Sequence, residues 1–348
     1  MAPIGIAIIG GGIFIKDHHL PAVFKCDTLS LKAIYSRSLK TAQETSKLVT
    51  GDAPDLYAGD AGSGRTYHDL LLREDVQAVI IALPIPSQPE YVEAALAAGK
   101  HVLAEKPIAG DVAAARKLLG YYRSVSSKNK ATLAIAENHR FFPSFVYAAE
   151  QAASLGKLQH FSVKCFSLMA QDNKYFNTPW RTKPQYQGGF LLDGGVHHAA
   201  ATRLFLHGDA NGAHTVQAFT QQAQAHLPPI DTVSAIIKTR SGATGTYQHS
   251  AGSNVRAFEW DLGYEKGSVN VNGETVTVTP AGGEKTVKHF ERTSGVEEEV
   301  AAWAQSLADG KPNPRQSPEE ALADLEFLEK MFKSGDEKGS GQTYELQL

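Results

Sequence analysis

The sequence predicts an α/β protein with an N-terminal doubly wound parallel sheet and a C-terminal α+β domain whose large open sheet is mostly antiparallel. In the first part of the chain, short apolar strands alternate with helical segments, which is typical of a parallel sheet covered on both faces. After about residue 137, strands follow one another through turn signals such as Asn272-Gly273, which favours antiparallel pairing. A length of 348 residues also suggests about two domains, and we place them at residues 1–137 and 138–348.

The predicted elements of the first domain begin with the apolar strand Ile4–Ile9, which ends in three glycines. A helix follows over Phe14–Lys25, and Pro21 either kinks it or marks its start. The stretch Asp52–Gly64, rich in Gly, Asp and Ala, is predicted to be a surface loop. The other strands are Leu29–Tyr35, Ala78–Leu83, His101–Ala104 and Leu133–Ala136, and the other helices are Leu39–Thr50, Tyr67–Arg73, Glu90–Ala98 and Asp111–Ser124.

The second domain is predicted to be rich in strands and to end in two helices. Its strands are Phe161–Met169, Thr215–Gln222, Thr232–Thr239, Thr244–Ser250, Glu259–Gly263, Ser268–Val271, Glu274–Thr279 and Lys285–His289. The closing helices are Val296–Ala308 and Ser317–Lys333, and Ser317 followed by Glu320 has the spacing of a capping box. With few helices to cover these strands, one sheet face needs a partner, so we expect a homodimer or a higher homo-oligomer.

Composition excludes several classes of function. The net charge of -3 provides no basic surface for nucleic acid or for an anionic membrane. Cys26 and Cys165 are too few for a disulfide framework and do not have the spacing of metal ligands. The apolar run at residues 78–85 is too short to span a bilayer, and Met1-Ala2-Pro3 supplies no positive segment of a secretory signal. We therefore expect a cytoplasmic protein.

A glycine-rich turn follows the first strand. Gly10 and Gly12 match the first two glycines of G-x-G-x-x-G, which allow a tight turn and the close approach of a pyrophosphate, whereas Ile15 occupies the third position. The second strand ends in Ser36-Arg37-Ser38, where an NAD-binding protein would place a carboxylate for the ribose 2′-hydroxyl. Hydroxyls and a guanidinium suit a 2′-phosphate instead. This pattern favours NADP(H), with NAD(H) possible; a plain turn and a surface arginine are the alternatives.

Glu105-Lys106-Pro107 follows another apolar strand. Pro107 restricts Lys106 to an extended conformation at the open end of the parallel sheet. An ammonium group there can donate to a substrate oxygen, although an exposed lysine in a turn remains the alternative.

The densest polar and glycine-rich segment of the second half is residues 188–198. If Leu191–Leu206 is helical, Asp193 and His197 are four residues apart on one face, and a carboxylate beside an imidazole suits general acid–base chemistry. An Asp cap with a helix-face His is the structural alternative, and His198 is predicted to pack. A zinc site formed by His197, His198 and Asp193 is another interpretation. However, histidines that are adjacent in sequence diverge on a helix, and the chain has no third ligand at a suitable spacing, so we predict no metal.

Taken in order, these motifs and Trp180-Arg181 resemble the Gfo/Idh/MocA family (glucose–fructose oxidoreductase, inositol dehydrogenase and relatives) over nearly the whole chain. The resemblance implies a Rossmann domain, an α/β domain whose open sheet forms a dimer interface, and a pyridine-nucleotide oxidoreductase of sugars or polyols. It implies that Lys106 and His197 are the catalytic pair and that Asp193 supports His197 or binds substrate. The chain departs from the family pattern at Ile15, at Gln88 where many members have His, and at Ala200 where Asp is frequent.

The resemblance and the motifs together assign residues to each ligand. The cofactor-binding residues are predicted to be Gly10, Gly12, Ile13, Phe14, Ser36, Arg37, Leu83, Pro84, Glu105, Lys106, Asn138, Trp180 and Arg181, and the substrate-binding residues Lys106, Asn138, Asp193 and His197. The sequence thus predicts an NADP(H)-dependent oxidoreductase of a small sugar-like or polyol-like substrate. Two alternatives stay open: a catalytically silent NAD(P)-binding regulator of the same fold, and an enzyme that uses NAD as a transient redox cofactor.

Overall fold

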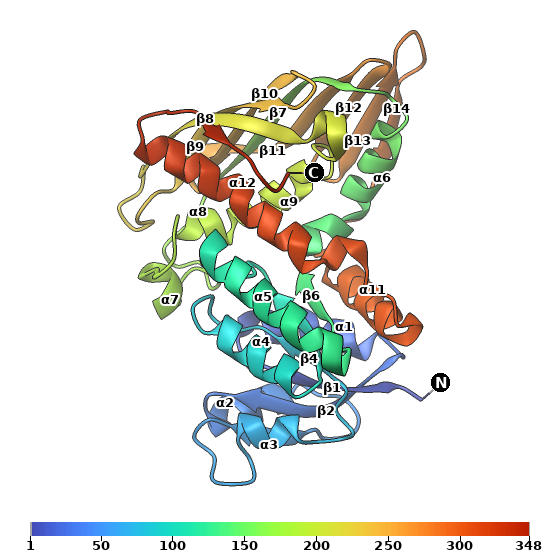
Figure 1. Ribbon diagram of the computed structural model, residues 1–348, viewed down its shortest axis with the longest axis vertical. Coiled ribbons are helices and arrows are strands. Elements are labelled where there is room, and N and C mark those ends of the chain that lie inside the picture. The colour runs from blue at the N-terminus through green and yellow to red at the C-terminus, as the bar shows by residue number, and fades with distance from the viewer. Residues whose placement is uncertain (1, 348) are drawn as a thin grey trace. The chain divides into compact units, whose positions relative to one another are not determined.

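The structure, a computed structural model, describes residues 2–347 (Figure 1). The chain divides into two compact units. The first comprises Met1–Asn138 and Val296–Ala321, and the second comprises His139–Gly295 and Leu322–Leu348.

The first unit is built on a parallel sheet in the order β3-β2-β1-β4-β5-β6. Its strands are β1 (Ile4–Ile9), β2 (Leu29–Ser36), β3 (Asp55–Ala58), β4 (Ala78–Ile81), β5 (His101–Glu105) and β6 (Leu133–Ala136). This confirms the predicted doubly wound sheet. The prediction of a loop over Asp52–Gly64 was wrong, because Asp55–Ala58 pairs with Ala33–Ser36 and extends the sheet at its edge.

The helix that follows β1 is irregular. It begins as a π-helix, Ile15–His19, and continues as α1 (Leu20–Phe24), with Pro21 in the first turn of α1. Pro21 has no N–H to donate, and the N–H of Leu20 bonds the carbonyl of Ile15 five residues back. The other helices are α2 (Leu39–Ser46), α3 (Tyr67–Leu71), α4 (Gln88–Ala97), α5 (Val112–Asn129), the 3₁₀ turn η3 (Pro314–Gln316) and α11 (Val296–Asp309). The helix predicted from Asp111 is confirmed, and the Asp111 side chain caps α5 by accepting from Ala114 N at 2.7 Å.

The helix α11 is part of the core of the first unit, although it lies far along the chain. Val300 and Trp303 are fully buried in one cluster with Ile6, Ile80 and Leu103 of the parallel sheet. An amphipathic helix thus covers a sheet face that the earlier helices leave open. The first unit is therefore completed by residues that follow the second sheet in sequence.

The second unit is built on a mostly antiparallel sheet in the order β14-β13-β12-β11-β7-β10-β9-β8-β15. Its strands are β7 (Leu158–Leu168), β8 (Ala213–Gln221), β9 (Thr232–Thr239), β10 (Thr244–Ser250), β11 (Gly252–Tyr264), β12 (Gly267–Asn272), β13 (Thr275–Pro280), β14 (Thr286–His289) and β15 (Gln342–Thr343). The pair β7 and β10 is parallel, and the remaining neighbours are antiparallel. The predicted α+β fold with a large open sheet is confirmed.

Helices lie against one face of this sheet (Figure 1). The unit contains η2 (Asn138–Phe141, whose first residue belongs to the first unit), α6 (Pro143–Ala152), α7 (Pro179–Thr182), α8 (Phe190–Asp193), α9 (Gly195–Arg203), α10 (Gly208–Asn211) and most of α12 (Pro318–Asp336). The Nε1 of Trp260 donates to Thr202 of α9 at 2.9 Å, and Ser334 of α12 accepts from Ala218 N of β8 at 2.8 Å. On the opposite face Phe219 is 68% and Ile236 60% exposed.

A buried ion triad fixes η2 to α12. Arg140 donates to both carboxylate oxygens of Asp324, at 2.6 and 3.0 Å, and Arg203 of α9 donates to the same carboxylate at 2.7 Å. The side chains of all three are at most 4% exposed. Two guanidinium groups around one carboxylate satisfy the charges that burial would otherwise penalise.

Candidate active site

The carboxyl ends of the parallel strands bring the predicted nucleotide residues to one edge of the first sheet. Gly10 follows β1, Leu83 and Pro84 follow β4, and Lys106 follows β5. The order of the strands reverses between β1 and β4, and in such sheets ligands bind beyond the carboxyl ends at that point. The arrangement fits a dinucleotide that spans β1 and its neighbours.

The glycines after β1 serve different purposes. Gly10 has φ +126°, and a Cβ there would lie 2.4 Å from the carbonyl oxygen of Ala82. A Cβ on Gly12 would meet no atom within 4 Å, so Gly12 borders open space that a pyrophosphate can approach. Ile15 is fully buried with Ile8 and Leu20, and it therefore packs the helix on the sheet where the usual motif has glycine.

The end of β2 presents charged and polar groups in the order that the sequence predicts. Ser36 is buried, Arg37 is exposed, and Ser38 caps α2 by accepting from Thr41 N at 3.2 Å. Sequence reasoning missed Asp60, whose carboxylate accepts from Leu39 N at 2.7 Å. Burial raises the pKa of the Tyr35 hydroxyl, and the charges of Arg37 and Asp60 act on that hydroxyl in opposite directions. The cationic Arg37 and the anionic Asp60 thus both lie near the end of β2, where a ribose 2′-substituent is expected.

Lys106 is partly exposed directly after β5, and its peptide bond to Pro107 is cis. The backbone of the preceding Glu105 is held in the sheet by pairing with Ala136 of β6. Asn138, which follows β6, is also partly exposed and begins η2. The structure therefore places the lysine and the asparagine after adjacent strands.

In the second unit, Asp193 binds Arg181. The Arg181 Nε donates to Asp193 Oδ2 at 2.6 Å, and its Nη1 donates to the carbonyl oxygen of Tyr175 at 2.8 Å. The guanidinium carbon lies 4.0 Å from the centroid of the Trp180 ring, in cation–π geometry. Burial, followed by the Asp193 charge, raises the pKa of the nearby Tyr186 hydroxyl. Trp180, Arg181 and Asp193, which the sequence singled out separately, thus form one cluster.

The helix predicted over Leu191–Leu206 is interrupted. It is divided at Gly194 into α8 and α9, so Asp193 ends one helix and His197 lies in the next. A Cβ on Gly195 would lie 2.8 Å from His249 Nδ1. The absence of a side chain at Gly195 therefore lets α9 pack against β10.

His197 stacks on another histidine. The rings of His197 and His139 lie 4.5 Å apart at 19°, and His139 also contacts His198 at 5.9 Å. Burial, followed by the charges of His139 and His197, lowers the pKa of His198 well below its usual range. His198 in turn packs edge-on against His249 at 4.5 Å, which confirms its predicted packing role. A cluster of imidazoles at this spacing resists carrying more than one positive charge.

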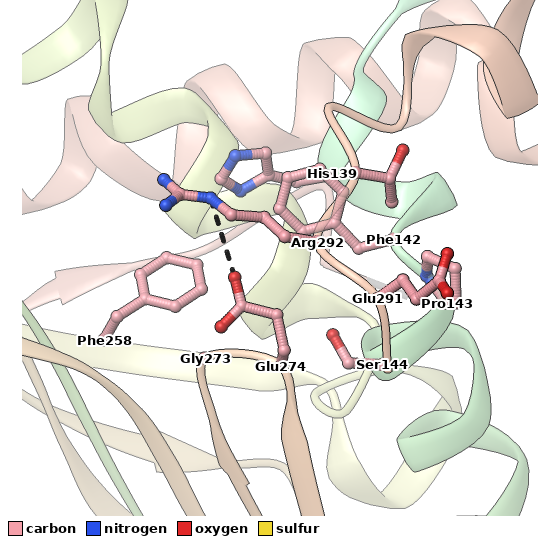
Figure 2. A pocket seen from close by; sticks show the side chains of 10 residues that line it. His139, Phe142, Pro143, Ser144, Phe258, Gly273, Glu274, Glu291 and Arg292 are labelled. Atoms are coloured by element: carbon pink, nitrogen blue, oxygen red, sulfur yellow. Dashed lines mark ion pairs between the residues drawn. The ribbon is translucent and has the colours of Figure 1, made fainter. Parts of the chain in front are cut away.

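A pocket of about 440 Å³ lies beside this histidine pair in the second unit (Figure 2). Its lining includes the aromatic rings of His139, Phe142 and Phe258, together with Glu274 and Arg292, whose Nε lies 3.7 Å from Glu274 Oε1. Sequence reasoning missed this pocket, because its walls come from η2, the start of α6, β11, the turn between β12 and β13, and the segment after β14. His139 lines the pocket and stacks on His197, so a ligand in the pocket would contact the first of these two histidines.

Within residues 2–347, no helix is long and apolar enough to cross a membrane. The same residues contain no group of three or more His, Cys, Asp or Glu side chains arranged to hold a metal ion.

Comparison with known proteins identifies the family. Residues 4–130 match the model of an oxidoreductase family with an NAD-binding Rossmann fold, and residues 147–276 match the GFO/IDH/MocA C-terminal domain. The chain is 38% identical to Dehydrogenase FPY6 of Fusarium mangiferae, covering 97% of this chain and 98% of that protein. It is 26% identical to D-xylose 1-dehydrogenase (NADP(+)) 2 of Haloferax volcanii, covering 78% and 82% of the two chains.

A solved structure gives the same result. An oxidoreductase from Thermotoga maritima superposes with a TM-score of 0.86 at 31% identity, covering 98% of both chains. The chain belongs to the Gfo/Idh/MocA family of oxidoreductases, and it is an NAD(P)-dependent enzyme of alcohol and carbonyl groups.

Proposed function

We propose that this protein is an NADP(H)-dependent oxidoreductase of a sugar, a polyol or a sugar-like carbonyl compound. The observation that carries the proposal is the edge of the first sheet at which β1 and β5 both end. Gly12 borders open space after β1, and the partly exposed Lys106 follows β5, which is separated from β1 only by β4. A dehydrogenase of D-xylose among its relatives supports the sugar class.

In the proposed chemistry, a bound nicotinamide supplies or accepts the hydride. In the oxidative direction, neutral His197 takes the hydroxyl proton of the substrate, and the Lys106 ammonium stabilises the alkoxide as it develops. The stacked His139 favours a neutral His197, since two protonated imidazoles at 4.5 Å repel each other. Asp193 holds Arg181 through the hydrogen bond from its Nε, and this pair fixes the guanidinium beside Trp180.

The choice of NADP(H) over NAD(H) is part of this proposal. It rests on Ser36 and Arg37 at the end of β2 and on the NADP(+) named for the xylose dehydrogenase. Asp60 opposes the preference, because its carboxylate repels a 2′-phosphate. We infer that Arg37 outweighs Asp60, since its guanidinium can form charge-assisted bonds to a phosphate.

The test is a nicotinamide absorbance assay of the purified protein against a panel of sugars and polyols, with both nucleotides and in both directions. Turnover of at least one substrate class with NADP(H) is expected. Tight NADPH binding without turnover of any panel member would contradict the enzymatic proposal and favour a silent regulator. A tightly retained nucleotide with turnover but no net NADPH consumption would indicate a transient redox cofactor.

We further propose that the protein works as a cytoplasmic homodimer, assembled through the open face of the second sheet. Phe219 of β8 and Ile236 of β9 are exposed on that face, near each other across the β8–β9 ladder. Exposed apolar side chains on a broad sheet face indicate a protein partner. The cytoplasmic location is supported by the free Cys26 and Cys165, and cell fractionation tests it.

A further inference from the structure

The segment Glu105–Pro107 is anchored from the start of α4. Gln88, the first residue of that helix, is 1% exposed, and its Nε2 donates to the carbonyl oxygen of Glu105. The same nitrogen lies 3.4 Å from the carbonyl oxygen of Pro107. Since carbonyl oxygens accept and do not donate, the amide nitrogen must point at them. One side chain therefore holds the main chain on both sides of Lys106.

A second anchor comes from the π-helix that follows the glycine turn. The Nε2 of His19 lies 2.6 Å from Glu105 Oε1, and the two side chains are 0% and 12% exposed. Within residues 2–347, His19 Nδ1 is buried with no hydrogen-bond partner, so Nε2 carries the proton and donates it to the carboxylate. Glu105 is thus fixed through its side chain by His19 and through its carbonyl by Gln88.

The buried amide of Gln88 is only partly satisfied by hydrogen bonds. Among the described residues, Gln88 Oε1 is buried and accepts no hydrogen bond, which destabilises the folded state. An apolar side chain of the same length would avoid this unsatisfied acceptor, but it would leave the carbonyl oxygens of Glu105 and Pro107 without the donor that Gln88 supplies. We propose that Gln88 is a positioning residue for Lys106, and that His19 assists it through Glu105. This proposal rests on the proposed function of Lys106.

The deciding variants are Gln88→Met, which keeps the length and removes the donor, and Gln88→His, which restores a ring N–H. The matched control is Gln316→Met, because Gln316 is also 1% exposed and its Nε2 donates to a carbonyl oxygen, that of Glu299, at 3.1 Å. Acetic anhydride labelling of Lys106, followed by mass spectrometry over a pH series, needs no substrate. We expect Gln88→Met to change the labelling rate of Lys106, and Gln88→His and Gln316→Met to leave it near that of the parent.

With a substrate from the sugar and polyol panel, Gln88→Met is expected to lower kcat on the order of tenfold, with the NADPH dissociation constant changed less than about twofold. Parent-like kcat and labelling in Gln88→Met would overturn the positioning role while leaving the role of Lys106 intact. Full activity of Lys106→Ala would instead overturn the proposed function. If Gln88→Met does not fold, the shorter amide Gln88→Asn takes its place, and parent-like labelling of Lys106 in that variant would contradict the proposal.

Discussion

Arg140 and Asp324 form a bidentate ion pair inside the second unit, and both side chains are at most 3% exposed. The pair fixes the residue directly after His139, the ring that stacks on His197. A contact between η2 and α12 thus sets the position of a histidine beside the proposed base.

Replacing Asp324, the carboxylate that Arg140 and Arg203 share, should lower the urea concentration at which the protein unfolds. Asp324→Ala leaves the buried Arg140 and Arg203 without their anion, and we expect the free energy of unfolding to fall by about 3–5 kcal/mol. Urea denaturation measures this. Glu319→Ala is the matched control, because Glu319 begins the same helix and pairs with Arg123 at 3.0 Å while 51% exposed. A loss for Glu319→Ala above about 1 kcal/mol would be inconsistent with this reasoning.

Coenzyme preference should respond to charge at the end of β2. The parent protein is expected to bind NADPH more tightly than NADH, and Arg37→Ala should remove most of that difference, on the order of 1.5–3 kcal/mol. Asp60→Asn should act in the opposite direction and increase the preference for NADPH. Titration calorimetry measures the dissociation constants of NADPH and NADH for the parent and for each variant. Equal affinities in the parent would rule out the assignment of Ser36 and Arg37.

The proposed catalytic pair should control turnover more than binding. Lys106→Ala and His197→Ala are each expected to lower kcat on the order of 100-fold or more, with a much smaller effect on NADPH affinity. The double variant should be far from additive, because in the proposed mechanism both groups act on one substrate oxygen. Steady-state kinetics on a confirmed substrate provide the measurement. Parent-like turnover in either single variant would show that the mechanism is assigned to the wrong residues.

Glu299 should make the stability of the protein depend on pH. Its carboxyl is 0% exposed, and burial, followed by the charges of Glu105 and Glu137, raises its pKa well above 4.5. A carboxyl with a higher pKa in the folded than in the unfolded chain takes up a proton on folding. Its contribution to stability is therefore fully present below about pH 4.5 and decreases as the pH rises, by about 1.4 kcal/mol per unit.

The isosteric Glu299→Gln removes this titration. We expect the variant to gain stability relative to the parent as the pH rises above 4.5, and the difference to be constant below that value. Urea denaturation at a series of pH values from acid to neutral tests it. If the difference in unfolding free energy between the parent and Glu299→Gln does not change with pH, Glu299 has the same pKa in the folded and unfolded chains, contrary to this prediction.

The open face of the second sheet should support assembly. Phe219→Lys and Ile236→Lys, which introduce charges at side chains 68% and 60% exposed, should convert the homodimer to monomer without unfolding it. Light scattering at micromolar protein gives the mass. Leu72→Lys is the control, since Leu72 is 67% exposed on the first unit and lies outside this face. A monomeric parent would contradict the proposed dimer.

Local patterns in the sequence were sufficient for most of the fold. Short apolar runs predicted β1, β4 and β5, because buried parallel strands have that composition. The strand Asp55–Ala58 was missed because its position depends on pairing with β2 and not on its own residues. The helix α6 was also missed, although Pro143 in its first turn is a usual start signal.

The candidate site was predictable where its chemistry is local. Gly10, Gly12 and Lys106 stand in short motifs, whereas the partner of Asp193 proved to be Arg181, twelve residues away in sequence. Spacing along an assumed continuous helix pointed to His197 and could not reveal the break at Gly194. His139, Asp60 and the anchoring role of Gln88 depend on contacts between distant segments, for which a single sequence carries no periodic signal.

The position of α11 has a consequence for the order in which the protein can fold during synthesis. The ribosome completes β6 at Ala136, 167 residues before it reaches Trp303, the side chain that fills the core beside Ile6 and Ile80. Until then the parallel sheet has an uncovered apolar face. A nascent chain, or a fragment cut after residue 138, would therefore expose that face to chaperones and to other chains, and the nucleotide-binding half should not be obtainable as a separately expressed N-terminal piece.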